Sequence, residues 1–265
     1  MDFVDNIQLA CCEIYSKELL EIKSKEGYIL TNKLDWIKIK YHLIDGLVII
    51  EGDIELGLEQ DLIWNEKPSN SEEISLESVI FDPINIVRWP NKIVYYLIDP
   101  DLPNKERIHL AIQHWQSKTS MKFIERTTET NYVYFVSGNG CSSRIGMVGG
   151  KQNIRLAENC FWGNVVHEIA HAIGFWHEQS REDRDDYVTI HLENVKSGEE
   201  HNFEKHIIDA KDVGLYDYGS IMHYGKYAFS KNGKPTIEPK DPTAEIGQRE
   251  SLSDKDIQTI NVIYS

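Results

Sequence analysis

Residues 167–177 carry three histidines and a glutamate at spacings that suit a catalytic metal site. His167 and His171 are four residues apart, so on a helix both imidazoles lie on one face and can reach one ion. With His177 as a third nitrogen ligand, one coordination position stays open for water, which is typical of catalytic rather than structural zinc. Zinc lowers the pKa of bound water to about 7, and Glu168 is placed to take the proton and pass it to a leaving amine. The segment therefore predicts a hydrolase with one catalytic Zn²⁺.

A helix must carry the first two histidines, and it must end before the third. Apolar residues fill the positions between the histidines, and Asn164, Val165 and Val166 precede them. Gly174 stands where the helix should stop, because glycine accepts the left-handed conformation that ends a helix and turns the chain. That turn would bring His177 back towards the metal.

Three other interpretations of this segment stay open. The first is a buried helix that carries histidines without binding a metal. The second is a zinc site that only binds, for which Glu168 is not needed. The third is a zinc hydrolase that acts on something other than peptides.

Beyond the zinc motif, the chain resembles the astacin family of zinc endopeptidases, within the metzincin clan. The matching segments follow the family's order over about residues 86–265, and they are 177–181, 183–188, 216–224, 228–230, 235–237, 246–249 and 252–257. The resemblance implies an α+β fold with a metzincin-like two-lobed domain, in which a twisted mixed sheet with helices lies over a loop-rich lower lobe. It also implies zinc-dependent cleavage of peptide bonds in protein or peptide substrates.

The resemblance assigns roles to five further residues. Met222 would lie beneath the zinc as an apolar platform. Tyr224 would be a further zinc ligand at rest and would donate a hydrogen bond to the oxyanion during turnover. Glu178 would pair with the new amino terminus after maturation, and Cys141 would form a disulfide with Cys160. An ordinary core methionine, a core or surface tyrosine and a solvated acid are the alternatives for the first three.

The segment from Ile50 to Asp53 resembles the family's pro-segment motif, phenylalanine-any-glycine-aspartate. The resemblance implies that Asp53 occupies the position of the zinc-bound water and keeps the enzyme latent. A carboxylate is a competent zinc ligand, and Gly52 would let the backbone come close to the metal. Ile50 departs from the family's phenylalanine, and a turn between two strands is the alternative for this segment.

This resemblance divides the chain into a pro-segment, residues 1–78, and an astacin-like metalloprotease domain, residues 79–265. An activating protease is expected to cut near Ser78–Val79. A cut after Arg88 is disfavoured, because it would remove the residues that should thread back towards Glu178.

Negative charge is concentrated in the N-terminal part of the chain. The formal net charge is −15, and residues 1–78 hold 17 acidic and 7 basic residues, a net charge of −10. No basic stripe is present to neutralise phosphates, so nucleic acid binding is disfavoured. No run of 18 apolar residues exists, so no transmembrane helix is expected.

The chain has four cysteines. A disulfide between Cys141 and Cys160 would indicate an oxidising compartment, and two reduced thiols in a cytosolic protein are the alternative. No role is assigned to Cys11 and Cys12, for which a thiolate that blocks zinc is one option. No signal peptide is visible, since acidic residues precede Cys11 without a basic region or an apolar stretch. We expect a secreted or otherwise extracytoplasmic monomer.

Hydrophobic periodicity predicts the remaining elements. An amphipathic helix is expected over residues 1–25, strands within 34–50 and a linker over 65–78. In the second part we expect strands at 93–98, 122–124 and 132–136, a helix after an N-cap at Asn104, and helices near 193–208 and 253–264. An extended substrate would pair with an exposed strand edge, which we assign to Ile154, Arg155 and Leu156.

Overall fold

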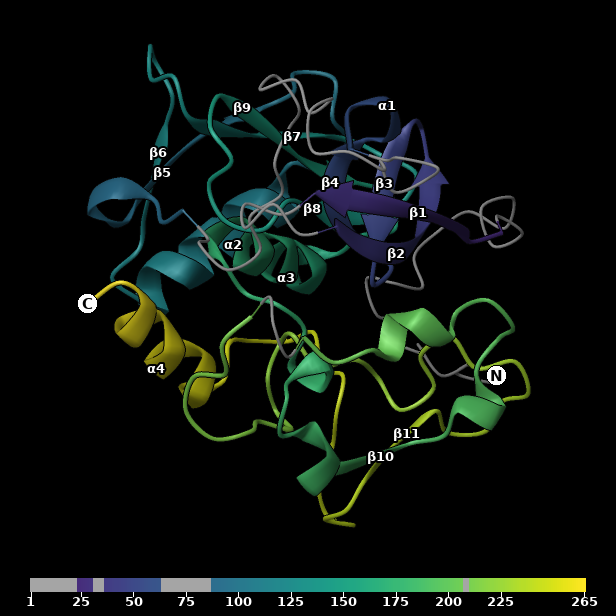
Figure 1. Cartoon of the computed structure of the whole chain (residues 1–265). Coiled ribbons are helices and arrows are strands. Elements are labelled where there is room, and N and C mark those ends of the chain that lie inside the picture. Colours follow the sequence, from purple (N-terminus) through teal and green to yellow (C-terminus); the bar gives the residue numbers. More distant parts are fainter. Residues whose placement is uncertain (1–22, 31–35, 63–86, 207–209) are drawn as a thin grey trace, which may run out of the picture.

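The computed structural model describes residues 23–30, 36–62, 87–206 and 210–265 (Figure 1). Four sequence expectations lie wholly or mostly outside these ranges. They are the helix over 1–25, the linker over 65–78, the cleavage site at Ser78–Val79 and the vicinal cysteines at 11 and 12.

One mixed sheet dominates the described part of the chain. Its nine strands follow the order β1-β2-β3-β4-β8-β9-β7-β5-β6. The strands are β1 (Lys25–Leu30), β2 (Trp36–Ile44), β3 (Leu47–Ile50), β4 (Ile54–Leu58), β5 (Ile93–Ile98), β6 (Lys122–Glu125), β7 (Tyr132–Ser137), β8 (Cys141–Ser143) and β9 (Lys151–Leu156). The strands expected at 93–98, 122–124 and 132–136 are therefore confirmed, as are two strands within 34–50.

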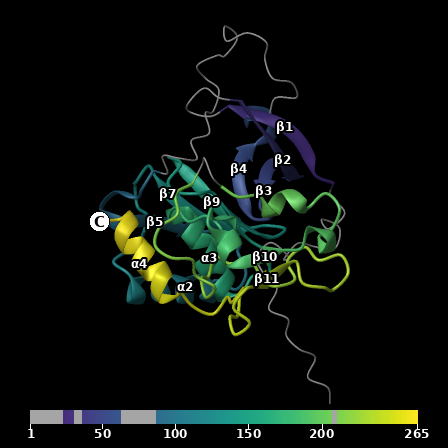
Figure 2. The same ribbon diagram turned by 60° about the horizontal axis from the view of Figure 1, so that its bottom comes forward.

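The sheet joins the two predicted parts of the chain. Strands β1 to β4 form an antiparallel meander that lies beside the strands of the second part (Figures 1 and 2). β4 joins β8 by parallel pairing of Ile54 with Ser143, and the Ser143 amide donates to the Asp53 carbonyl at 3.0 Å. β8 and β9 are antiparallel, whereas β9, β7, β5 and β6 run parallel to one another.

Two long helices pack together against this sheet. α2 (Glu106–Lys118) contacts α3 (Trp162–Ile173), and α3 contacts β8 and β9. The face of α2 predicted from periodicity, which includes Ile108, Ala111 and Trp115, is buried in the main core. α4 (Asp254–Ile263) closes the chain, and the Ser253 hydroxyl accepts a hydrogen bond from the Asp256 amide at 2.9 Å as its N-cap. A short helix, α1 (Glu59–Leu62), follows β4.

The region below α3 is loop-rich (Figure 1). It contains a two-stranded sheet of β10 (Val188–Ile190) and β11 (Ile237–Pro239) and a separate aromatic core that includes Phe203, Tyr216 and Tyr224. The sheet with its helices above and this second cluster below confirm the expected two-lobed α+β architecture.

Two local predictions are wrong. Asn104 is not the N-cap of α2, because it adopts a left-handed conformation with φ 54° and Lys105 caps the helix instead. The helix near 193–208 does not form within the described residues. Gly198 has φ 94° there, which interrupts a right-handed helix, and the chain makes only short 3-10 helices at Leu192–Asn194 and Glu200–Phe203.

The assignment of the exposed strand edge is also wrong. Ile154, Arg155 and Leu156 belong to β9, which has β8 on one side and β7 on the other. Without β1 to β4, the edge of the sheet would be β8, so β4 lies where an added strand would pair. No helix in the described ranges is long and apolar enough to cross a membrane.

Candidate active site

Helix α3 presents the first two histidines and ends where the sequence predicts. Its first turn is held by the Asn164 side chain, which accepts a hydrogen bond from the Phe161 amide at 3.0 Å. Gly174 ends the helix with φ 118°, and its amide donates to the Ala170 and His171 carbonyls at 3.1 and 2.9 Å. The left-handed turn directs the chain back, so that His177 reaches the same point as the helical histidines.

Each imidazole is oriented by a hydrogen bond at Nδ1. The partners are the Ile221 carbonyl for His167 and the Phe175 carbonyl for His171, both at 2.8 Å. The partner of His177 is the carboxylate of Glu51, with 2.6 Å between Oε2 of Glu51 and Nδ1 of His177. Because Nδ1 is engaged in all three rings, Nε2 is the nitrogen available for a shared ion.

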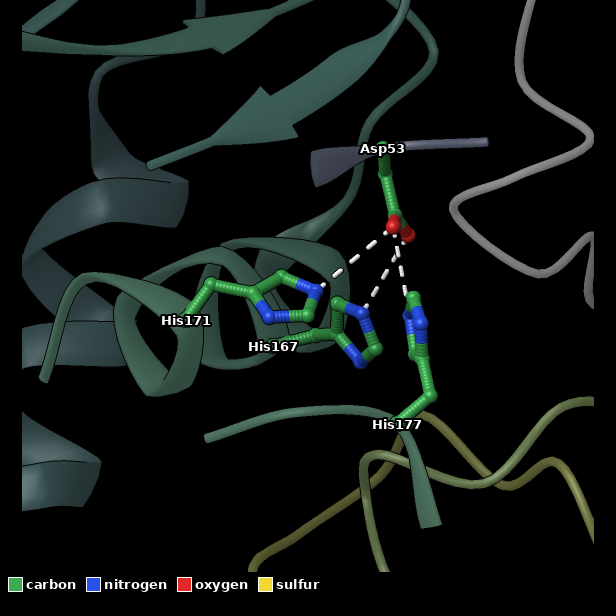
Figure 3. A group of neighbouring side chains, drawn as sticks. All are labelled: Asp53, His167, His171 and His177. Carbon is green, nitrogen blue, oxygen red and sulfur yellow. Dashed lines mark ion pairs between the residues drawn. The ribbon is translucent and has the colours of Figure 1, made fainter. Parts of the chain in front are cut away.

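Asp53 faces the three Nε2 atoms (Figure 3). Its Oδ2 lies 3.3 Å from the nitrogen of His167, and its Oδ1 lies 3.5 Å from that of His171 and 3.2 Å from that of His177. The ligand atoms of the four residues lie within 4.8 Å of one another, and all four side chains are buried. The turn between β3 and β4 therefore places this carboxylate over the metal motif.

These atoms suit a bound cation. The two Asp53 oxygens and the three Nε2 atoms are buried and make no hydrogen bond to any described residue. Buried polar atoms without hydrogen bonds are costly, and a cation at their centre would satisfy all of them. Three imidazole nitrogens and one carboxylate oxygen match the ligand types and number of tetrahedral zinc.

The protonation of the histidines fits this use. Burial lowers the pKa of His167 and of His171, which favours the neutral imidazole that a metal needs. Burial also lowers the pKa of His177, but the carboxylates of Asp53 and Glu51 outweigh it and raise the value to about 9. A cation bound at Nε2 would take the place of that proton.

Three further predicted residues lie around the histidines. Glu168 follows the first histidine on α3 and is buried. Met222 is buried in the main core, and its carbonyl accepts a hydrogen bond from the Glu178 amide at 3.2 Å. The Tyr224 ring centroid lies 4.7 Å from that of His177, while its hydroxyl donates to the Glu51 carbonyl at 2.6 Å.

Glu51 was not predicted from the sequence, yet it has several partners in this site. Its carboxylate is buried and also accepts a hydrogen bond from the Ser180 hydroxyl at 2.9 Å and pairs with His206. Burial opposes ionisation, but the neighbouring histidines outweigh it and lower the Glu51 pKa. Its backbone has φ 46°, in the left-handed region. Only its position two residues before Asp53 could have drawn attention to it.

Glu178 lies next to the third histidine, beside a cavity of about 250 Å³. Its Oε1 accepts a hydrogen bond from the Asp217 amide at 2.7 Å and lies 3.6 Å from the Arg181 guanidinium. Burial raises the pKa of this carboxyl to about 8 against the opposing effect of Arg181. A carboxylate in this position is suited to accept an incoming cation.

The disulfide implied by the resemblance is present. Cys141 of β8 is bonded to Cys160, which precedes α3, with 6.3 Å between the two Cα atoms. The bond links β8, the strand that pairs with β4, to the residue that lies just before the helix carrying His167 and His171.

Comparisons with known proteins agree with this geometry. Residues 83–265 match the model of the peptidase family described as Astacin. The chain is 43% identical over 192 residues to Blastula protease 10 of Paracentrotus lividus, which covers 67% of this chain and 32% of that protein. It is 36% identical over 232 residues to Astacin-like metalloprotease toxin 1 of Loxosceles intermedia, which covers 84% of this chain and 83% of that protein.

A solved structure has a similar fold. It is High choriolytic enzyme 1, a hatching enzyme zinc-protease from Oryzias latipes, with a TM-score of 0.62 and 38% identity over 67% of this chain and 92% of that chain. The match to the toxin extends into the part before residue 83, since it covers more of this chain than the family model does. This chain spans only 31% to 41% of the length of the first three curated relatives that it matches.

Proposed function

Because the chain belongs to the astacin family of zinc metalloendopeptidases, we propose that residues 79–265 hydrolyse peptide bonds in protein substrates and that residues 1–78 are a pro-segment that keeps them latent. Of the functions considered from the sequence, family membership favours peptide hydrolysis over a zinc site that only binds and over hydrolysis of other substrates.

The residues of the site have distinct roles in this reaction. His167, His171 and His177 hold the metal, which when bound supplies a polarised scissile carbonyl and an acidified water. Glu168 takes the proton of the attacking water and delivers it to the leaving amine. The Tyr224 hydroxyl, once it is released from Glu51, donates a hydrogen bond to the developing oxyanion.

Latency rests on Asp53 in this proposal. The observation that carries it is the placement of both Asp53 oxygens 3.2 to 3.5 Å from the Nε2 atoms of the three histidines. A carboxylate in this place would fill the coordination position that the attacking water needs. Glu51 supports the same state, because its carbonyl accepts the hydrogen bond of the Tyr224 hydroxyl.

Maturation would remove the meander β1 to β4 and free this site. We propose that a separate protease cuts near Ser78–Val79 and that the new amino terminus enters the cavity beside Glu178. Support comes from the raised pKa of this buried carboxyl, because a cationic partner would stabilise its ionised form. The disulfide Cys141–Cys160 supports a secreted protein, which we take to be a monomer.

The test of latency is Asp53→Ala in the full-length chain, with zinc-dependent casein cleavage as the readout. We expect the variant to cleave casein faster than the unmodified chain and to lose this activity with a chelator. Asp61→Ala, which removes an exposed acid from the same pro-segment, is the matched control and should stay latent. Unchanged latency in Asp53→Ala would rule out Asp53 as the blocking ligand. A folded, zinc-loaded protein from which residues 1–78 have been removed and which cleaves no peptide would contradict the proposed function itself.

A further inference from the structure

The meander β1 to β4 also contacts the loop-rich lower lobe, at a place separate from the metal site. His42 of β2 lies with its Nε2 3.0 Å from Oε1 of Glu199, which belongs to that lobe. The same loop passes the residue just before β1, since a Cβ at Gly198 would lie 3.3 Å from Oγ of Ser24. This contact involves neither Asp53 nor the pairing of β4 with β8.

Two histidines and one carboxylate lie together at this contact. The side chain of His42 is 11% exposed and that of Glu199 is 17% exposed. The ring centroid of His201 lies 5.4 Å from that of His42. Oε2 of Glu199 accepts a hydrogen bond from the Asn202 side-chain amide at 2.7 Å. Both oxygens of the one anion are therefore engaged, by His42 and by Asn202, and neither is bonded to His201.

The surroundings of His201 favour its neutral form. Its Nδ1 bonds to the Gly198 carbonyl at 2.8 Å, whereas its Nε2 is buried and makes no hydrogen bond to any described residue. A proton on Nε2 would be a buried donor without an acceptor, which is costly. Burial lowers the pKa of His201 from its ordinary value of 6.5, and the cationic forms of His42 and Lys40 lower it further. Glu199 and the Gly198 carbonyl oppose this shift without outweighing it.

Departure of the meander would change these surroundings. His42 and Lys40, two of the groups that disfavour a proton on His201, both belong to β2 and would leave with it. The pKa of His201 is therefore lower in the joined state than in the separated second part of the chain. Because the separated part binds this proton more tightly, separation becomes more favourable as the pH falls below the ordinary value of 6.5. Above that value this histidine favours neither state by protonation.

We propose that His42, Glu199 and His201 form an acid-sensitive contact, which retains the meander on the lower lobe near neutral pH and weakens as the pH falls. The inference rests on the proposed role of residues 1–78 as a pro-segment that leaves after cleavage. It adds a condition to that step, since the cut pro-segment should separate more completely in a mildly acidic medium than in a neutral one.

The experiment uses the full-length chain, cut within residues 63–86 by a site-specific protease and kept with zinc. The fraction that stays joined on gel filtration is followed over a dilution series, which gives a dissociation constant. It is measured at pH 7.5 and pH 5.5, about one unit on either side of the ordinary pKa of histidine. The same pair of measurements is made on His201→Asn, whose amide nitrogen can still donate to the Gly198 carbonyl but cannot take up a proton.

The dissociation constant of the unmodified chain should rise more between pH 7.5 and pH 5.5 than that of His201→Asn, by about three- to tenfold. The histidines of the metal site also titrate, but they do so in both chains, so the difference belongs to position 201. His109→Gln removes an exposed histidine of α2 and is the matched control, which should behave like the unmodified chain. If His201→Asn retains the first fragment poorly at pH 7.5, His201→Gln gives the same comparison.

An equal rise in the unmodified chain and in the variants at position 201 would overturn the inference, as would fragments that stay joined equally well at both pH values. The readout is separation of the fragments and needs no peptidase activity. A folded, zinc-loaded second fragment that cleaves no casein would therefore contradict the proposed peptidase function, while the pH comparison would still decide whether His201 controls release.

Discussion

At the scale of single residues, Glu168 is the group whose loss should separate catalysis from metal binding. It lies outside the group of four residues whose ligand atoms converge, so Glu168→Gln should leave the zinc content unchanged. The proton transfer proposed for it contributes roughly 100- to 10,000-fold in rate, and kcat/KM of the activated enzyme should fall by that factor. Metal analysis and casein cleavage measure the two effects. Glu182→Gln changes an exposed acid nearby and should alter neither; activity that survives in Glu168→Gln would remove it as the base.

The buried carboxyl of Glu178 predicts a pH dependence of stability. Its pKa is raised to about 8 in the folded chain from an ordinary value of 4.5. Between these values the folded chain keeps a proton that the unfolded chain loses, so the free energy of unfolding falls as pH rises, by up to about 1.4 kcal/mol per pH unit. Glu178→Gln cannot ionise and should lack this slope. Thermal unfolding of the full-length chain from pH 5 to pH 8 should show the variant gaining stability relative to the unmodified chain, and a constant difference would contradict the assignment.

Some of these residues could be predicted from the sequence and others could not. His167, His171, Glu168 and Gly174 lie within one short segment, where helix geometry alone relates their positions. Glu51 is different, because its contact with His177 joins positions 126 residues apart. No local rule relates such distant positions, so only the folded chain reveals that Glu51 is a hydrogen-bond partner of a predicted metal ligand.

At the scale of elements, the sequence correctly predicts those helices and strands whose pattern depends only on neighbouring residues. The buried face of α2, the strand β5 and the helix α4 follow from periodicity and capping, which need only neighbouring residues. The order of strands is not local. β8 is three residues long and carries no alternating apolar pattern, so the sequence showed β9 but not the strand beside it. For that reason the sequence predicts the exposed edge at β9, whereas β8 lies between β9 and β4.

Gly174 ends α3, and its substitution tests whether the end of this helix positions His177. Alanine at φ 118° is strained, so Gly174→Ala should lower the free energy of unfolding by about 1 to 2 kcal/mol and displace His177. Gly233→Ala places alanine at φ 71° in open space, far from the histidines in sequence, and should cost stability alone. Zinc affinity, measured by competition with a chelator, should fall only in Gly174→Ala. Equal affinity in both variants would show that His177 does not depend on the helix ending.

At the scale of the whole molecule, two parts of the chain share one sheet and one cluster of metal-binding groups. β4 of the first part pairs with β8 of the second part. Asp53 likewise comes from the first part, and the three histidines that it faces come from the second part. Parallel pairing between these strands involves a single register pair, so the sheet alone is a short contact. The hydrogen bond between Glu51 and His177, the contacts of Glu55 with Ser142 and Arg155, and the packing of Ile145 and Trp176 against the apolar cluster of β2 to β4 add to this pairing.

This arrangement predicts that the metal holds the pro-segment in place after the chain is cut. A ligand that binds the joined state more tightly than the separated parts stabilises the joined state by that difference in affinity, and an ion shared by Asp53 and the three histidines would be such a ligand. We expect a chain cut within residues 63–86 by a site-specific protease to run as one species on gel filtration with zinc and to separate into two fragments when a chelator is added. In Asp53→Asn the cut chain should separate to the same extent with and without zinc, whereas Asp61→Asn should behave like the unmodified chain. If zinc retained the pro-segment equally well in Asp53→Asn, the coupling would have to come from the strand contact and Glu51, because the carboxylate at position 53 would then contribute nothing to the shared site.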